Sequence, residues 1–125
     1  MIATTANALD VARAYLDAMA AKDVDTIMSL CAEGVVCTSP RGQLTGLEHF
    51  RAFQAGFATM IVQLRVLAIH GNQTQATLVY EVQTHPVPHC TVAELIEVQD
   101  GKLVSTVVIY DAAPFAAYQA SLQAH

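Results

Sequence analysis

Charged residues are scarce in this sequence, and basic residues are the scarcest of them. Only 14% of the 125 residues are charged, with six Lys or Arg against eleven Asp or Glu, and the formal net charge is −5. A chain with so few cations has no basic cluster that could neutralise a phosphate backbone. We therefore expect no nucleic-acid partner.

Long apolar runs and paired cysteines are also missing. No uncharged apolar stretch approaches the roughly 18 residues that a membrane span requires, and the first residues lack the basic start and apolar block of a signal peptide. The cysteines, Cys31, Cys37 and Cys90, form no C-x-x-C pair, which argues against a disulfide framework and for a reducing compartment. These features predict a cytoplasmic protein with no membrane partner.

Apolar residues, in contrast, make up 54% of the chain. A chain of 125 residues has the size of one ordinary domain, and the sequence contains no repeat or linker. We therefore expect one domain over residues 1–125. The apolar surplus is more than such a small domain needs for its core, which favours an oligomer or an apolar cavity.

Predicted helices come first in the chain and predicted strands come last. Three helices are expected from apolar residues at helical spacing, and the later segments have the alternation and turn residues of strands. This order is typical of an α+β fold with an antiparallel meander. The expected helices span about 7–21, 23–32 and 47–57, and the expected strands span about 35–39, 60–70, 75–84, 90–99 and 102–110.

The last two strands contain an acidic residue at an unusual place. Asp100-Gly101 predicts a two-residue hairpin turn, which pairs Gln99 with Lys102 and fixes the register of the strands. One face of this hairpin is then mostly apolar and carries only two charged residues, both acidic, and we expect it to line a pocket. The opposed pairs on that face are Glu94 with Val107, Val92 with Ile109, and Cys90 with Asp111.

The opposite face of the same hairpin is more apolar than a solvated sheet face should be. This excess predicts a second buried contact, most simply a homodimer formed by this face in two copies of the chain. The residues expected in the dimer contact are Leu95, Val104, Val108 and Tyr110.

The order of elements, the segment "ARAYLDAMAAKDVDTIMSLCAEGVVCTSPRGQLTGLEHFRAF" and the closing "VQDGKLVSTVVIYD" resemble the nuclear transport factor 2-like superfamily. Within it the chain looks like the SnoaL-like and ketosteroid-isomerase-like branch. The resemblance implies a cone, in which a strongly bent antiparallel sheet wraps around N-terminal helices as a cystatin-like α+β roll. It also implies a pocket at the open end and, in many members, a homodimer through the outer face of the sheet.

The resemblance further implies an enzyme that needs no cofactor and moves a proton on a small apolar organic molecule, as an isomerase, cyclase or dehydratase does. Ketosteroid isomerases use a base together with a tyrosine and a protonated carboxyl. Tyr15 matches that tyrosine, which implies that it donates a hydrogen bond to a developing oxyanion on the ligand, and Glu94 matches that carboxyl. Ser39 stands where the base is expected and is not basic near pH 7. Asp111 matches an acid or base that other branches place on the last strand.

Each candidate also has a purely structural interpretation. Glu94 could pair with Arg51 or Arg65, or it could point into water in another register. Tyr15 could be an ordinary core residue, and Asp111 could cap a following helix. The alternative function is therefore a ligand-binding or dimerisation module without turnover. His85 and His89 do not have the spacing of a zinc site, so no metal is expected. The residues expected to contact the ligand are Ser39, Phe50, Phe53, Phe57, Val92, Val107 and Ile109.

Overall fold

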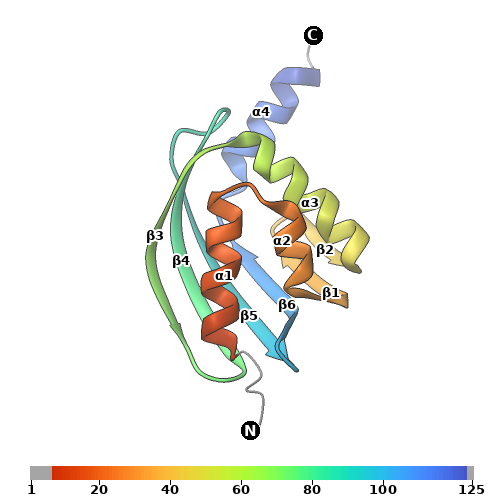
Figure 1. Cartoon of the computed structure of the whole chain (residues 1–125). Helices are drawn as coiled ribbons and strands as arrows, with labels where there is room; N and C mark the ends of the chain where they lie inside the picture. Colours follow the sequence, from red (N-terminus) through yellow and green to blue (C-terminus); the bar gives the residue numbers. More distant parts are fainter. Residues whose placement is uncertain (1–6, 124–125) are drawn as a thin grey trace, which may run out of the picture.

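A computed structural model describes residues 7–123 of the chain. It has the predicted order, with helices in the first half and four consecutive strands in the second (Figure 1). The described elements are α1 (Ala8–Ala20), α2 (Val24–Ser29), β1 (Cys31–Ser39), β2 (Gly42–Thr45), α3 (Leu47–Met60), β3 (Ile61–Gly71), β4 (Gln75–Thr84), β5 (Cys90–Gln99), β6 (Lys102–Ile109) and α4 (Ala113–Gln123).

The strands form one curved sheet that does not close into a barrel. The strand order is β2-β1-β6-β5-β4-β3, and the sheet bends around α1, which packs against β3, β4 and β5 (Figure 1). Neighbouring strands are antiparallel except for β1 and β6, which are separated by β2, α3 and β3 to β5 along the chain and pair in parallel. The predicted α+β cone is confirmed.

Helix α1 forms because its apolar residues recur on one side. Tyr15, Leu16 and Met19 are among the residues that this side buries against the sheet. The side chain of Asn7 caps the helix by accepting a hydrogen bond from the backbone N–H of Asp10 at 2.8 Å. The prediction of a first helix capped by Asn7 is confirmed, and its consequence is that Tyr15 points into the concave side of the sheet.

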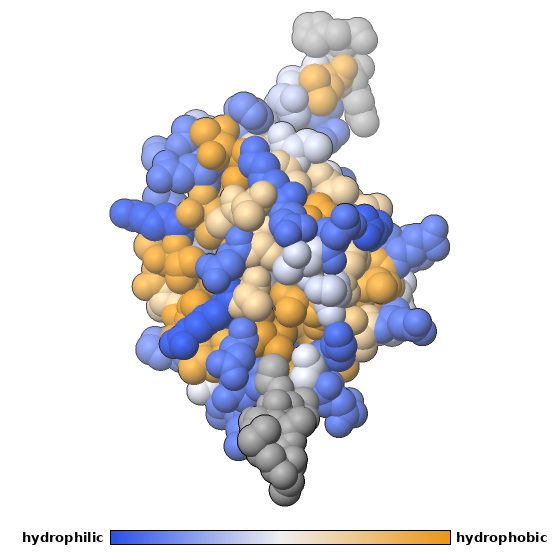
Figure 2. Space-filling view, viewed as in Figure 1, coloured by the Kyte–Doolittle hydropathy of each residue, from blue (hydrophilic) through white to orange (hydrophobic). Residues whose placement is uncertain are grey.

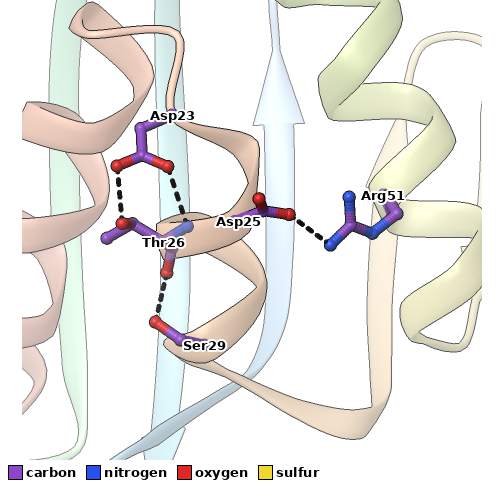
Figure 3. A network of polar contacts seen from close by, with 5 residues as sticks. All are labelled: Asp23, Asp25, Thr26, Ser29 and Arg51. Atoms are coloured by element: carbon purple, nitrogen blue, oxygen red, sulfur yellow. Dashed lines mark hydrogen bonds and ion pairs between the residues drawn. The ribbon is translucent and has the colours of Figure 1, made fainter.

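Helix α2 is held at its start by polar contacts (Figure 3). The carboxylate of Asp23 accepts from the backbone N–H of Thr26 at 3.1 Å and from its hydroxyl at 2.7 Å. Arg51 of α3 forms an ion pair with Asp25 at 2.7 Å, and the hydroxyl of Ser29 donates to the carbonyl of Thr26 at 2.6 Å. The first two contacts cap the short helix, and the ion pair links it to α3.

The prediction that this helix extends to residue 32 is wrong. The backbone N–H of Leu103 donates to the carbonyl of Leu30 at 2.8 Å, and Cys31 pairs with Leu103 on β6. Hydrogen bonds to the sheet thus replace the last helical turn. The strand that we expected over 35–39 begins at Cys31 instead.

Strand β2 was not predicted, because its residues were interpreted as a turn. The turn itself is only Pro40 and Arg41, after which Gly42 pairs with Ser39 and the chain runs back along β1. Gly46 then begins α3 with a φ of 99°, a backbone conformation that favours glycine.

The β5–β6 hairpin contains a β-bulge that the alternation of residues does not predict. Asp100 and Gly101 have φ of 51° and 76°, and Gln99 pairs with Lys102 as predicted. Val98 then pairs with Leu103 but Glu97 pairs with Ser105, so Val104 is an extra residue on β6. Every later pairing is therefore shifted by one residue.

This shift reverses the two faces of β6. Glu94 lies opposite Val108, and the expected pairing of Glu94 with Val107 is wrong. Val108 points inward and is 7% exposed, whereas Val107 and Ile109 point outward and are 38% and 59% exposed. The expectations that Val107 and Ile109 line the interior and that Val108 and Tyr110 lie on the outer face are therefore wrong, because one inserted residue turns each following side chain to the other face.

The apolar surplus of the sequence is only partly buried by the fold. Figure 2 shows hydrophobic surface along the side of the molecule where β3 lies. The large apolar side chains of Val62, Val66 and Leu67 on β3 are exposed to solvent. None of the helices within residues 7–123 is both long enough and apolar enough to span a membrane.

Candidate functional site

A cavity of about 420 Å³ opens between the concave side of the sheet and helix α3. Its volume lies in the range of sites that hold small organic molecules. Its wall is mostly apolar and aromatic, with Met19 from α1, Val82 from β4, Val92 from β5 and Val108 from β6. Phe115, Tyr118 and Gln119 of α4 contribute to its rim, and α4 projects beyond the end of the sheet (Figure 1).

Glu94 is the one acidic residue among the described residues that line this cavity. It faces inward with Val92 and Ile96 because side chains alternate along β5, and it is 1% exposed. The alternatives in which Glu94 faces water or pairs with an arginine do not hold, since Arg51 and Arg65 pair with Asp25 and Glu81. A buried carboxyl without a cation must be stabilised by hydrogen bonds.

Three hydroxyl groups from three elements supply those hydrogen bonds. Tyr15 of α1 donates to Oε1 of Glu94 at 2.9 Å, and Thr106 of β6 donates to the same oxygen at 2.7 Å. Tyr80 of β4 donates to Oε2. A carboxylate offers about four acceptor positions, so Oε2 has one position left beside Tyr80.

Burial and hydrogen bonding act on the pKa of Glu94 in opposite directions. Removal from water raises the pKa, while the hydroxyls of Tyr80, Thr106 and Tyr15 lower it by stabilising the charged form. Burial is the larger effect, so the pKa of Glu94 lies above the ordinary value for glutamate. This is the direction expected for a desolvated carboxyl that exchanges a proton.

The two tyrosines keep their protons for the same reason. Burial raises the pKa of Tyr15 and of Tyr80 well above the ordinary value, and the nearby charge of Glu94 raises both further. The hydroxyl of Tyr15 also accepts a hydrogen bond from Nε2 of Gln54 at 3.0 Å. Tyr15 therefore donates to Glu94, and not directly to a ligand as we had expected from the resemblance.

Gln54, Tyr80 and Thr106 were not singled out from the sequence. Gln54 lies on α3 at the buried position four residues after Phe50, and a buried glutamine within an apolar stripe was a signal that could have been used. Tyr80 faces inward between Leu78 and Val82 on β4. Thr106 could not have been found, because in the unbulged register it points outward.

The other proposed site residues lie outside this cluster. Asp111 is exposed and does not line the cavity, and its Oδ1 accepts from the backbone N–H of Ala113 at 3.0 Å, so it caps α4. Ser39 lines a separate cavity of about 220 Å³ next to Arg41. Its hydroxyl oxygen accepts from the backbone N–H of Arg41 at 3.1 Å.

The three phenylalanines of α3 have different positions. Phe50 is buried in the core and stacks on Phe53 with ring centroids 6.4 Å apart. Phe53 and Phe57 line the main cavity without filling it. Within residues 7–123 no group of three or more His, Cys, Asp or Glu side chains is arranged to hold a metal ion.

Comparisons with known proteins agree with this architecture. A structure of a Kribbella flavida protein, described as a known function protein, is 38% identical, with a TM-score of 0.88 over 98% of this chain and 100% of that chain. A second Kribbella flavida structure, of a candidate ketosteroid isomerase, is 20% identical, with a TM-score of 0.73 over 82% of this chain and 76% of that one.

A third structure, of a candidate polyketide cyclase from Sinorhizobium meliloti, is 16% identical, with a TM-score of 0.71 over 79% of this chain and 93% of that one. At such identities the second and third structures show the fold alone. No curated protein matches the chain. The family model of the SnoaL-like domain matches residues 12–106, and the chain therefore belongs to the SnoaL-like domain family, within the nuclear transport factor 2-like superfamily.

Proposed function

We propose that this SnoaL-like domain binds a small apolar organic molecule in its cavity and transfers a proton with Glu94, as an isomerase, cyclase or dehydratase. One observation carries the proposal. A single carboxyl with a raised pKa lies on the wall of an apolar cavity and is held by three hydroxyl groups. A proton acceptor is most effective when its pKa approaches the working pH, and burial moves Glu94 in that direction.

The chemistry begins at Oε2, the oxygen with a free acceptor position. A C–H bond next to a ligand carbonyl breaks, its proton goes to Oε2, and its electron pair moves to the carbonyl oxygen to give an enolate. No cofactor enters this step. Return of the proton to another carbon completes an isomerisation. In a cyclisation the enolate carbon forms a bond to a second carbonyl carbon of the ligand, and the oxygen of that carbonyl takes up the released electron pair and then the proton from Oε2.

The same proton transfer makes a hydrogen-bond donor available to the enolate. Once Oε2 carries a proton, Glu94 can donate a hydrogen bond to the hydroxyl oxygen of Tyr80, from which it previously accepted one. The hydroxyl hydrogen of Tyr80 is then available to another acceptor. Tyr80 is the partner that can turn, since within residues 7–123 its hydroxyl has no hydrogen bond except that to Oε2. Tyr15 is held in place by Gln54 as well as Glu94 and acts as a positioning residue. Tyr80 would then donate to the developing oxyanion.

Hydrogen exchange in D2O tests this proposal without knowledge of the natural substrate. Apolar cyclic ketones would be incubated with the protein, and deuterium at the carbon next to the carbonyl would be followed by NMR. We expect exchange above the buffer rate for ketones that fit the cavity, and loss of about 100-fold or more in Glu94→Gln, as is typical when a general base is removed. Glu97→Gln, an exposed glutamate on the same strand, is the matched control and should leave the rate unchanged.

Binding without turnover is the second candidate function. It is favoured by the position of Ser39, which stands where the resemblance expects a base and lies outside the main cavity. In that case ketones would bind with unchanged affinity in Glu94→Gln and would show no exchange above buffer. Asp111→Asn separates a third case, because a loss of exchange in that variant would assign the base to Asp111.

A second copy of the chain is the partner that we propose for the outer face of the sheet. Leu95 pairs with Val107 across β5 and β6, Ala93 pairs with Ile109, and Val79 pairs with Ala93 across β4 and β5. These side chains form one apolar strip because paired residues point to the same face. Such a strip is typical of an isologous contact, in which two copies bury the same surface.

A further inference from the structure

Arg41 is the one cation among the described residues that line the main cavity. It lies in the tight turn between β1 and β2 and is exposed at the rim, whereas Glu94 is buried in the wall. Arg41 and Phe53 also line the smaller cavity of about 220 Å³, so both residues border the main cavity and the smaller one. The proton-transfer chemistry proposed above makes no use of this residue.

The turn that carries Arg41 is fixed by local hydrogen bonds. The backbone N–H of Arg41 donates to the hydroxyl oxygen of Ser39 at 3.1 Å. At the start of β2, Gly42 has a φ of 122°, and Nε2 of Gln43 donates to the hydroxyl oxygen of Thr38 at 3.3 Å. The start of the Arg41 side chain is thus held at the rim of the cavity.

The guanidinium of Arg41 has no acidic partner within residues 7–123. The ion pairs in that range join Arg51 to Asp25 at 2.7 Å and Arg65 to Glu81 at 3.5 Å. The positive charge of Arg41 nevertheless acts electrostatically on a residue of the cavity wall. Burial raises the pKa of Tyr110, which lines the same wall, and the positive charge of Arg41 opposes that rise.

We infer that Arg41 binds the carboxylate of the ligand, so that the substrate class is an apolar keto acid whose carbonyl end reaches Glu94. This inference rests on the function proposed above. A planar guanidinium matches a carboxylate with two parallel hydrogen bonds. One cation, with no second cation among the described residues of the cavity wall, suits a group of one negative charge better than a doubly charged phosphate.

The charges of the cavity also fix the direction of binding. A carboxylate at the rim stays in contact with water and with Arg41, whereas the same group at the closed end would be desolvated and would face Glu94. The neutral carbonyl end therefore enters first. The apolar part of the ligand contacts side chains such as Phe57 and Val92 on the way.

A binding comparison between acids and their methyl esters tests the inference. The panel would hold aryl-substituted and cycloalkyl-substituted keto acids, each paired with its methyl ester, which has nearly the same shape and no charge. Affinities would be measured by calorimetry on the whole chain. We expect at least one acid to bind the wild-type protein about tenfold or more tightly than its ester, the usual size of a charge-assisted hydrogen-bonded contact.

Two variants that each remove one positive charge show whether the preference for the acid depends on Arg41. Arg41→Gln should lower the affinity for the acid about tenfold or more and leave that for the ester unchanged. Arg13→Gln removes an exposed positive charge from α1, outside the cavity, and should change neither. If no acid binds more tightly than its ester, or if both variants weaken the acid equally, the inference is overturned.

The same panel separates this inference from the proposed proton transfer. If neutral ketones exchange deuterium in a Glu94-dependent way while acids and esters bind alike, the role of Arg41 fails and the role of Glu94 stands. If Arg41 selects acids but no compound exchanges above buffer, the anion site stands and the proton transfer fails.

Discussion

Glu94 and Glu97 are the same residue type on the same strand, and they occupy opposite environments. Glu94 faces the cavity, is 1% exposed and accepts hydrogen bonds from three hydroxyl groups. Glu97 faces outward, is exposed, and its Oε1 accepts a hydrogen bond from Nε2 of Gln75 at 3.4 Å. The comparison teaches that the face of the sheet, and not the residue type, decides which carboxyl can do acid–base chemistry.

The largest effect is expected from charges placed on the two faces of β6. Val108→Asp puts a second carboxylate into the apolar cavity wall, opposite Glu94, where it is desolvated, and should destabilise the fold by about 3–5 kcal/mol. Val107→Asp, at the neighbouring outward position, should change the stability of the single chain by no more than about 0.5 kcal/mol. Denaturant unfolding of both variants measures the difference.

The same pair tests the proposed dimer face. Val107→Asp should reduce the hydrodynamic size in analytical ultracentrifugation, because it places like charges against each other across an isologous contact. An equal loss of stability in both variants would contradict the bulged register, and an unchanged size of the Val107→Asp variant would contradict the dimer.

A smaller effect is expected from removing one hydroxyl that holds the inner carboxyl. Tyr80→Phe leaves Oε2 of Glu94 without its donor and should destabilise the fold by about 1.5–3 kcal/mol, the usual range for a hydrogen bond to a charged group. The pKa of Glu94 should rise further, since one group that stabilises its charged form is lost. Tyr118→Phe, on the exposed helix α4, is the control and should leave both quantities unchanged.

The dependence of stability on pH should give the smallest and most specific signal. The folded pKa of Glu94 is raised, so its stabilising contribution is complete below the unfolded value near 4.5 and is lost as pH rises through the folded pKa. Glu94→Gln lacks this loss. The free energy of unfolding of the variant, relative to wild type, should therefore increase with pH above about 4.5 and then level off.

Glu97→Gln serves as the control, measured across the same pH series. A difference between Glu94→Gln and wild type that stays constant or falls with rising pH would show that burial does not dominate at this carboxyl.

Much of the fold follows from patterns that can be seen in the sequence. The apolar stripe of α1, its Asn7 cap and the Asp100-Gly101 turn each have a local physical cause, so each was predicted correctly. The end of α2 and the presence of β2 were not, because both depend on hydrogen bonds to strands far away in the sequence. Local signals cannot report such pairings.

The candidate site was predicted less completely than the fold. Glu94 and Tyr15 were identified, and the structure brings them within hydrogen-bond distance. Val107 and Ile109 were assigned to the wrong face because the extra residue Val104 leaves no mark in the alternation of β6. Asp111 follows the end of β6, and there its side chain caps α4.

The most direct test of the central claim is the titration of Glu94 itself. Its side-chain carboxyl carbon would be followed by NMR across the pH range and assigned by its absence in Glu94→Gln. We predict a midpoint above 4.5, the ordinary value for glutamate, and a further rise in Tyr80→Phe. A midpoint at or below 4.5 would contradict the account, because a carboxyl that stays ionised as easily as one in water has no reason to take a proton from a ligand.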